Sequence, residues 1–232
     1  MLSVLPSIDA SVAILAPGFR ALSITAAVTP ITDPDIADKA LAAACKSVIA
    51  GEARWADAHL AAWADVFRKF GAKPQRTPCS AEALRKRVLR DGSMPGIDPV
   101  VDLYNAVSLQ YAIPVGGENL AAYVGTPRLT MADGTERFDT MKDGLPAQES
   151  PEPGEVIWRD DEGATCRRWN WRQGVRTRLN SETRQMWFIL ESLPVMPLMA
   201  LYDAGERLSD GLQRMMPGVS IEMNLVGSDC RE

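Results

Sequence analysis

Histidine is almost absent from this chain, and cysteine is sparse. The only histidine is His59, and the four cysteines, Cys45, Cys79, Cys166 and Cys230, stand far apart with no CxxC pair. Zinc sites need such side chains at close spacing, and these four cysteines do not show the pattern of a disulfide framework, so we expect no metal and no other cofactor. A Ser-His-Asp or Cys-His mechanism would have to use His59. Because His59 falls on the apolar side of a predicted helix, we interpret it as a structural residue.

The sequence also lacks a long apolar run. No stretch reaches the roughly 20 residues that cross a membrane, and Asp9 interrupts the segment where a signal peptide keeps its apolar core. We therefore expect a cytoplasmic protein without a membrane partner. Its 232 residues are long enough to bury a sizeable core, and we predict one domain rather than two.

An excess of positive charge is missing as well. The formal net charge is -5, so the protein does not have the overall positive surface charge that favours binding of nucleic acid. Two stretches are nevertheless locally basic, and each is either a solvated face paired with nearby acids or a surface that contacts RNA. The first comprises Arg68, Lys69, Lys73, Arg76, Arg85, Lys86, Arg87 and Arg90, and the second comprises Arg167, Arg168, Arg172, Arg176, Arg178 and Arg184.

The pattern of apolar residues predicts mainly helices in the first half and short strands in the second. Mixed elements in this order favour an α+β fold. Helices are predicted from Asp33-Pro34 to about Gly51, over 52–70, over 80–90 with Ser80 as N-cap, from Pro99, and over 197–216. Strands are predicted at 11–16, 21–28, 128–131, 136–141, 187–191 and 219–226, with a hairpin within 154–171 and a loop before Gly154.

Residues 98–117, DPVVDLYNAVSLQYAIPVGG, combine a capped helix with a Pro-Gly loop. Asp98 suits the N-cap and Pro99 the first helical position. Apolar residues at helical spacing form one stripe, so this helix should face a core. Asn105 lies off the stripe, where its amide is solvated, holds the following loop or reaches a ligand. The stripe consists of Val100, Leu103, Tyr104, Val107 and Tyr111.

Two further places carry groups suited to ligand contact. Glu191 follows the apolar run MWFIL, where a carboxylate is either exposed at a strand end or desolvated and useful. The segment CRRWNWRQ, residues 166–173, interleaves aromatic and arginine side chains. As a strand it would place Arg168, Asn170 and Arg172 on one face. Such interleaving either stacks bases and pairs phosphates, or places tryptophans in a core with arginines outside.

An ordered series of motifs resembles a known family. The series runs RKRVLRDG, Pro-Gly-Ile, VVDLYNAVSL, a Pro-containing loop, LAAYVG, RLTMADGTERF and FILESL. Over roughly residues 80–193 it is similar to the B-three/B-four domain, the editing module in the beta subunit of bacterial phenylalanyl-tRNA synthetase. The resemblance implies a single domain with mixed and antiparallel sheets in a layered sandwich and flanking helices. Segment 11–70 and helix 197–216 would pack on this motif-bearing core.

The resemblance also implies roles for individual residues. Asn105 and Glu191 match the asparagine and glutamate of the family's editing pocket and are the candidate catalytic residues. Pro114 matches a loop proline, whereas Tyr104 replaces a threonine and Gly116 stands where the family has a histidine. These departures reshape the pocket and remove a proton carrier. The substrate-binding candidates are Tyr104, Pro114, Gly116, Arg168, Asn170 and Arg172.

In that family the module hydrolyses tyrosine wrongly attached to the phenylalanine tRNA. The resemblance implies a freestanding protein that binds the aminoacylated 3′ end of a tRNA and hydrolyses a mischarged ester, without the ligase activity of a complete synthetase. For Glu191 we prefer recognition of the substrate ammonium over activation of water, since an aminoacyl group carries a positive charge beside its ester. A non-catalytic RNA-binding module and a binder of a free amino acid or small aromatic metabolite stay open as alternatives.

Overall fold

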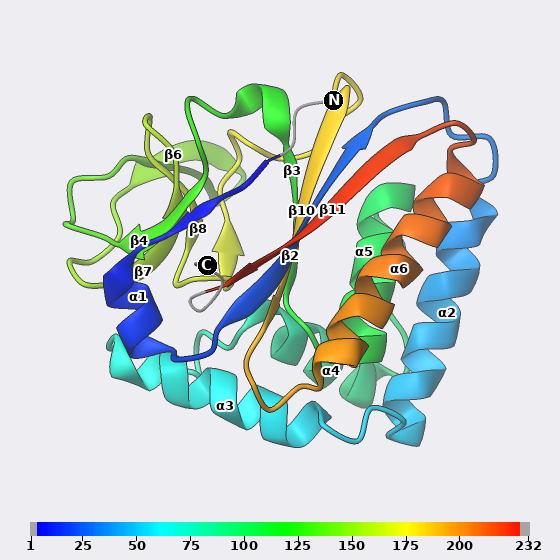
Figure 1. Ribbon diagram of the computed structural model, residues 1–232, viewed down its shortest axis with the longest axis horizontal. Helices are drawn as coiled ribbons and strands as arrows, with labels where there is room; N and C mark the ends of the chain where they lie inside the picture. The colour runs from blue at the N-terminus through cyan, green and yellow to red at the C-terminus, as the bar shows by residue number, and fades with distance from the viewer. Residues whose placement is uncertain (1–3, 228–232) are drawn as a thin grey trace.

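The computed structural model describes residues 4–227, which form an α+β fold of six α-helices and three sheets (Figure 1). This confirms the predicted fold class. A four-stranded sheet has the order β11-β2-β10-β3, a five-stranded sheet has the order β1-β4-β7-β8-β9, and β5 and β6 form a separate pair. All strand pairs are antiparallel except β1 with β4.

The elements have the following bounds. The helices are α1 (Ala10–Leu15), α2 (Asp35–Ala50), α3 (Ala56–Lys69), α4 (Ser80–Asp91), α5 (Pro99–Tyr111) and α6 (Leu198–Met215), with a 3-10 turn η1 at Leu120–Ala122. The strands are β1 (Ser7–Ile8), β2 (Arg20–Ala27), β3 (Val115–Asn119), β4 (Arg128–Met131), β5 (Phe138–Lys142), β6 (Leu145–Glu149), β7 (Val156–Arg159), β8 (Ala164–Arg167), β9 (Arg172–Gln173), β10 (Gln185–Ser192) and β11 (Ser220–Gly227).

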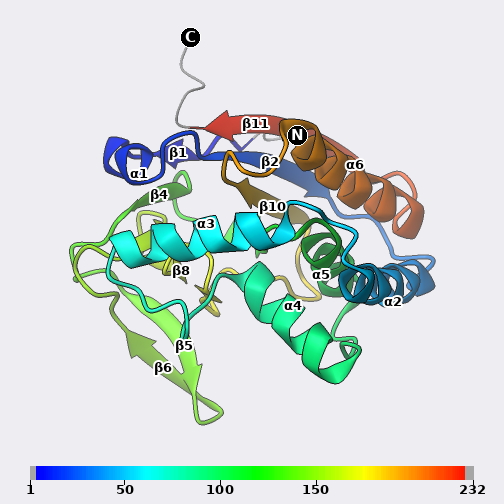
Figure 2. The ribbon, with the colours of Figure 1, turned by 90° about the horizontal axis from the view of Figure 1, so that it is seen from below.

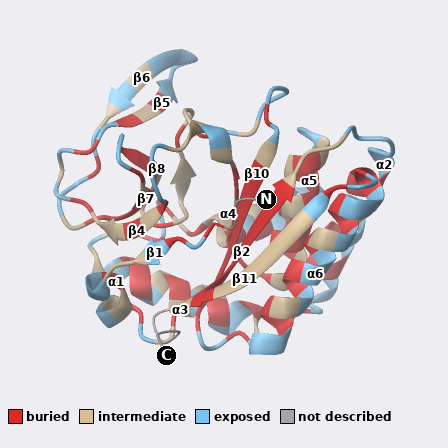
Figure 3. Ribbon diagram, turned by 45° about the horizontal axis from the view of Figure 1, so that its top comes forward, coloured by how far each residue is buried: buried red, intermediate tan, exposed pale blue. Residues whose placement is uncertain are grey.

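Strand β10 lies at the centre of the molecule and is buried on both faces (Figure 3). Phe188 and Leu190 point to a core shared with α2, α5 and α6, whereas Trp187 and Ile189 point to a second core shared with α3 and the five-stranded sheet. Alternation along a strand sends neighbouring side chains to opposite faces, so an apolar run such as MWFIL fills both cores. Glu191 continues the Trp187 face and is therefore carried inside.

Helix α5 has the predicted start and the predicted buried stripe. The Asp98 carboxylate accepts hydrogen bonds from the N–H groups of Val100 at 2.9 Å and Val101 at 3.3 Å, which satisfies two donors that a helix leaves unpaired at its first turn. Leu103 packs in the core under α6. The helix ends at Tyr111, the cap residue Ala112 has a left-handed conformation, and β3 begins at Val115. Asn105 is thereby held on a rigid element beside the central sheet.

The single histidine is structural, as predicted. His59 is fully buried on α3, its Nδ1 lies 2.9 Å from the carbonyl oxygen of Ala112, and its Nε2 accepts a hydrogen bond from the Leu193 N–H at 3.1 Å. Burial lowers the pKa of His59 to about 4, so the ring is neutral and joins α3 to the ends of α5 and β10.

Several predicted elements were wrong. The strand predicted at 11–16 is instead helix α1, Ala10–Leu15, because a short apolar run carries no period that separates the two structures. Helix α3 begins at Ala56, not at Glu52. Ser80 is the first residue of α4 instead of its cap. The loop predicted before Gly154 contains β6, which pairs with β5 in a hairpin that projects from the body (Figure 2).

The segment 166–173 is not one strand. Strand β8 ends at Arg167, and Arg168 and Trp169 adopt left-handed backbone conformations with φ of 46° and 65°. This turn breaks the predicted alternation, because Trp169 enters the core while Asn170 points back over the sheet. The strain of these conformations, about 1–2 kcal/mol each, is offset by the burial of Trp169 and by a hydrogen bond from the Arg168 N–H to Glu155 at 2.9 Å.

The described residues contain three cysteines, no metal-binding cluster and no membrane-spanning helix. Cys45, Cys79 and Cys166 are free thiols, and Cys230 lies outside the described residues. Within 4–227 no cluster of three or more histidine, cysteine or acidic side chains is arranged to hold a metal ion. None of the helices in that range has the length and apolar character needed to cross a membrane.

Candidate functional site

A pocket of about 400 Å³ opens between the central sheet, α4, α5 and the turn from β8 to β9. We call it the aromatic pocket, because its walls include Trp158, Trp169, Trp171, Trp187 and Tyr104. It contains Asn105, Glu191 and Asn170 together, from three segments that are far apart in the sequence. Figure 2 shows α4 beside α5, and these two helices are in contact.

The floor of the aromatic pocket is one face of the central sheet. Trp187, Ile189 and Glu191 alternate along β10, and the register places Glu118 opposite Trp187 and Gly116 opposite Ile189. A methyl group on Gly116 would lie 3.4 Å from Ile189 Cγ2, so glycine keeps this part of the floor open. The lack of a side chain at position 116 thus creates space where a histidine would fill it.

Glu191 is the most enclosed polar group of the floor. Its side chain is 1% exposed, and Oε1 accepts hydrogen bonds from the indole N–H groups of Trp158 at 2.9 Å and Trp169 at 2.8 Å. Oε2 accepts one from Asn170 Nδ2 at 2.9 Å. A carboxylate offers about four acceptor positions, so one position on Oε2 is left for a ligand. Burial raises the pKa of Glu191 to about 7 despite these three donors.

A second acid of the floor, Glu118, was not a sequence candidate. It is 4% exposed, and burial raises the pKa of its carboxyl group to about 8, although Thr177, Gln173 and two nearby arginines act in the opposite direction. Only the pairing of β3 with β10 brings it to this face. In sequence it follows Gly116-Gly117, where no helical or strand period marks a buried acid.

Unpaired polar atoms gather at the aromatic pocket. Five buried side-chain nitrogen or oxygen atoms among residues 4–227 have no hydrogen-bond partner, and three of them belong to pocket residues. They are Ser80 Oγ, Glu118 Oε2 and Asn170 Oδ1. Buried polar groups are normally satisfied. Their concentration here indicates a place where a ligand or water supplies the missing partners.

A larger pocket of about 680 Å³ adjoins the first and shares Tyr104, Trp171 and Gln173 with it. We call it the arginine pocket, because Arg172, Arg178 and Arg184 line it. Arg178 donates to the carbonyl oxygens of Gly174 and Gln173, and Arg184 donates to those of Ser181 and Thr183. Within the described chain neither guanidinium forms an ion pair, so both charges are available to an anion.

The other predicted site residues divide between these places. Tyr104, Asn105, Gly116 and Asn170 line the aromatic pocket, and the Asn105 amide makes no hydrogen bond to another described residue. Pro114 does not line it, and its carbonyl oxygen accepts the Glu191 N–H at 3.0 Å, which positions the acid.

Arg168 and Arg172 do not share a pocket face with Asn170, contrary to the predicted alternation, because the turn separates them. Arg172 lines the arginine pocket. Arg168 lies over the Trp171 ring at 4.7 Å, and its Nε is 3.8 Å from Glu155.

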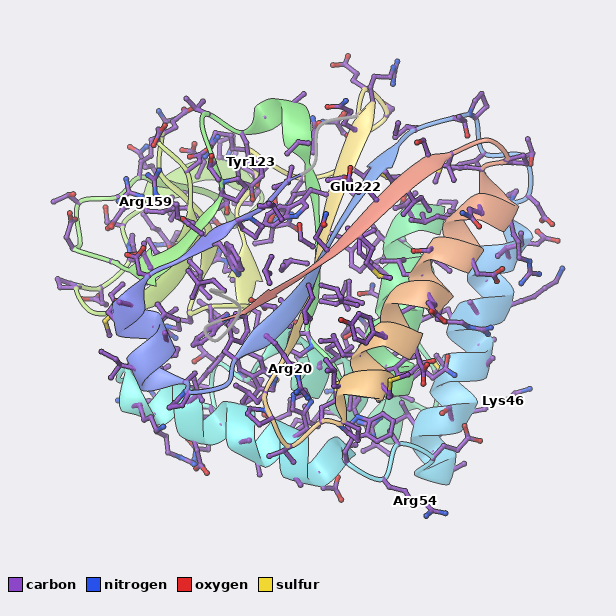
Figure 4. All side chains as sticks on the ribbon, in the orientation of Figure 1. Arg20, Lys46, Arg54, Tyr123, Arg159 and Glu222 are labelled. Carbon is purple, nitrogen blue, oxygen red and sulfur yellow. The ribbon has the colours of Figure 1, made fainter. Side chains whose placement is uncertain are left out.

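Three arginines of the two basic stretches form hydrogen bonds or ion pairs within the protein. Arg167 is buried and donates to Glu155 at 3.0 and 2.8 Å, and Arg176 binds the fully buried Asp160 at 2.9 and 2.7 Å. Arg85 donates to the carbonyl oxygen of Leu109 at 2.9 Å. These three arginines hold the fold together. The neighbouring Tyr123, labelled in Figure 4, packs edge-on against Trp187 and donates to Thr165 at 3.2 Å.

The described residues thus form an α+β fold in which two sheets and flanking helices surround a pocket with aromatic walls. The sequence profile of the B3/4 domain matches residues 62–197, more than half of the chain. The chain therefore belongs to the B3/4 domain family, in agreement with the resemblance carried by its motifs. The matched range contains both candidate catalytic residues and both basic stretches.

The fold is also similar to a solved structure, an N-terminal fragment of the phenylalanyl-tRNA synthetase beta-subunit from Pyrococcus horikoshii. The TM-score is 0.53 at 9% sequence identity, and the match covers 97% of this chain and 55% of that chain. At this identity the likeness establishes the fold alone. The chain spans about half the length of that fragment. Comparison with curated proteins gave no significant match.

Proposed function

We propose that this protein binds the aminoacylated 3′ end of a tRNA and hydrolyses the ester of a wrongly attached amino acid. The observation that carries the proposal is the meeting of Asn105, Glu191 and Asn170 in one pocket. Membership of the B3/4 domain family and a fold like that of a synthetase subunit support it. The continuity of β2 and β10 with both main cores further supports our proposal that the chain is one domain.

Hydrolysis of an aminoacyl ester requires mainly that the site position the ester and water and stabilise the negative charge that develops on the carbonyl oxygen. The free acceptor position of Glu191 binds the substrate ammonium, and the unpaired amide of Asn105 donates to the ester carbonyl oxygen as negative charge develops there. Water adds to the carbonyl carbon, the bond to the ribose oxygen breaks, and free amino acid and tRNA leave. His59 is buried elsewhere and Glu191 binds the substrate ammonium, so proton transfer falls to a ribose hydroxyl of the substrate.

The size and charge of the two pockets fit the two parts of such a substrate. A volume of about 400 Å³ suits an aminoacyl group, and the aromatic pocket holds acids that attract its ammonium. The adjoining arginine pocket, about 680 Å³, is wide enough for a terminal nucleotide, and its free guanidinium groups suit phosphate. Trp171, which lines both, offers a ring on which a base stacks.

A panel of mischarged tRNAs tests the hydrolytic claim. We expect purified protein, in excess over substrate, to release amino acid from at least one member faster than the spontaneous rate. Binding of these tRNAs without any release would favour the non-catalytic RNA-binding alternative. No release above background across the panel would refute hydrolysis.

Removal of the arginine-pocket charges should weaken tRNA binding. We expect Arg178→Ala and Arg184→Ala each to lower affinity at low salt and to reduce the slope of log affinity against log salt by about one unit, as loss of one phosphate contact does. Filter binding over a salt series measures both. Arg214→Ala is the matched control, because Arg214 lies on α6 and pairs with Asp210. Unchanged binding by both pocket variants would exclude the arginine pocket from the RNA site.

A second candidate function is the binding of a free amino acid without RNA. The unpaired acceptors and buried acids of the aromatic pocket favour it, since an ammonium group satisfies them by itself. Calorimetric titration with free amino acids separates the two functions. Micromolar or tighter binding without nucleic acid, combined with indifference to tRNA, would replace our main proposal.

A further inference from the structure

The aromatic pocket holds two buried acids at separate positions on one sheet face. Glu118 lies opposite Trp187, and Glu191 lies four residues further along β10 on the same face. At the rise of an extended strand, these positions are about 14 Å apart along the sheet. One acid suffices for a single ammonium group. The second has no role in the reaction described above.

Glu118 lacks a partner of opposite charge. No ion pair to Glu118 forms among the described residues, and its Oε2 accepts no hydrogen bond. Of the two arginines near Glu118, Arg176 pairs with Asp160, whereas Arg178 donates to the carbonyl oxygens of Gly174 and Gln173 and forms no ion pair with Glu118. A buried carboxyl group without a cation is costly. Its persistence in the floor of a pocket points to a partner on the ligand.

The other titratable groups around Glu118 are neutral at physiological pH. Burial raises the pKa of Tyr104 and Tyr123 above the usual tyrosine range, and it raises the pKa of the Cys166 thiol. Each of these groups would repel the Glu118 carboxylate if it were ionised, and none supplies positive charge. The chemistry at this end of the aromatic pocket is therefore that of an acid facing aromatic rings.

Aromatic faces beside an acid select a cation. The rings of Tyr104, Trp171 and Trp187 line the aromatic pocket near Glu118, and aromatic faces attract ammonium groups through their negative quadrupole. Ser80, whose N–H donates to the carbonyl oxygen of Asn170, has its unpaired hydroxyl oxygen at the Glu191 end of the pocket. A bound ammonium group favours the carboxylate form of Glu118 over the protonated acid, and a neutral hydroxyl group does not.

We propose that Glu118 is a specificity residue that binds a basic amino group on the ligand's side chain, so that the preferred ligand is an amino acid, or its ester, with an amine at both ends. The α-ammonium then binds at Glu191 and the side-chain ammonium at Glu118. The binding of the α-ammonium at Glu191 rests on the proposed function of the aromatic pocket. The binding of a side-chain amine at Glu118 defines a class of substrates, amino acids with a basic side chain, that the hydrolysis reaction by itself does not require.

Two amides that differ in one group test the assignment without hydrolysis. L-lysinamide and L-norleucinamide have similar length and the same α-ammonium, but only the first carries a side-chain amine. We expect wild-type protein to bind L-lysinamide about tenfold or more tightly in calorimetry, as a charge-assisted hydrogen bond provides. Glu118→Gln should abolish this preference with little effect on L-norleucinamide. Glu191→Gln should weaken both amides, and Glu206→Gln on α6 should affect neither.

Proton release on ligand binding distinguishes a binding role of Glu118 from a purely structural role, which would not change the number of protons released. Burial keeps Glu118 protonated in the empty aromatic pocket, with a pKa of about 8, whereas a bound cation favours the carboxylate. L-lysinamide should therefore release a proton at pH 7 beyond any released by L-norleucinamide, measured in buffers of different ionisation enthalpy. This comparison uses wild-type protein and stands even where Glu118→Gln does not fold.

Three results would overturn the assignment: equal binding of the two amides by wild-type protein, a preference that survives in Glu118→Gln, or tighter binding of L-tyrosinamide than of L-lysinamide. The outcomes are separable from those of the tRNA panel. Hydrolysis of a mischarged tRNA without an amine preference refutes only the role of Glu118. An amine preference without hydrolysis refutes only the proposed reaction.

Discussion

Replacement of Glu191 by glutamine is expected to lower the rate of ester hydrolysis on a responsive mischarged tRNA by about 100-fold or more. Glutamine keeps the shape of the side chain and an oxygen for the indole N–H groups of Trp158 and Trp169. It removes the negative charge and, because its amide nitrogen donates, the free acceptor position beside Asn170. Single-turnover measurement of released amino acid with excess protein gives the rate directly.

Asn105→Ala should give a loss of the same order, since an oxyanion donor contributes about 100-fold to acyl transfer. Glu206→Gln, on the exposed side of α6, should hydrolyse the substrate at the wild-type rate. Circular dichroism establishes that all three variants are folded. A Glu191→Gln protein that retains wild-type activity would show that this acid takes no part in the reaction.

The two pocket acids are also expected to make the protein less stable as pH rises. Glutamate has a pKa near 4.5 in the unfolded chain, whereas burial raises the pKa of Glu191 to about 7. Between these values the folded state binds a proton that the unfolded state has lost, so stability falls with increasing pH and levels off above pH 7. The shift of Glu191 corresponds to about 3 kcal/mol. For Glu118 the fall continues to about pH 8.

Comparison of each glutamine variant with wild type isolates this effect. His59 acts in the opposite direction between about pH 4 and its unfolded value of 6.5, but it is common to all proteins compared. We expect the free energy of unfolding of Glu191→Gln, measured by urea denaturation, to rise relative to wild type by about 3 kcal/mol between pH 5 and pH 8. A difference independent of pH, like that expected for Glu206→Gln, would contradict burial of the charge.

Stability and function oppose one another at these acids. A buried carboxyl group that lacks a cation weakens the folded state at neutral pH, yet the same group is ready to bind one. Glu191 is partly compensated by two indoles and an amide, and Glu118 has an unpaired oxygen. Occupation of the aromatic pocket by an amine should therefore stabilise the protein.

Predictions from the sequence were correct where neighbouring residues alone provide the interactions that decide the structure. Asp98 and Pro99 start α5 because a cap needs only the residues beside it. The apolar run before Glu191 is a strand, and His59 is structural, as their immediate surroundings predict. The α+β fold also followed from the order of such segments. The resemblance to the B-three/B-four domain then identified Asn105 and Glu191, which do lie in one pocket.

Predictions failed where a distant contact decides the outcome. The alternation expected for residues 166–173 is broken by a left-handed turn at Arg168 and Trp169, which the pairing with Glu155 and the core around Trp169 hold in place. Arg172 is thereby separated from Asn170 and enters the arginine pocket. No property of the eight residues themselves indicates where the turn falls.

The sequence by itself determined the helices and strands that have local caps and periods, the family, and three polar groups of the pocket, Asn105, Asn170 and Glu191. Only the tertiary structure decided which polar groups lose water and which keep a partner, because desolvation depends on everything that surrounds a side chain. It is strand register that brings Glu118 beside Trp187 and leaves its oxygen unpaired. It is the packing of two sheets that turns Glu191 from an acid at the end of a strand into one with a pKa near neutrality.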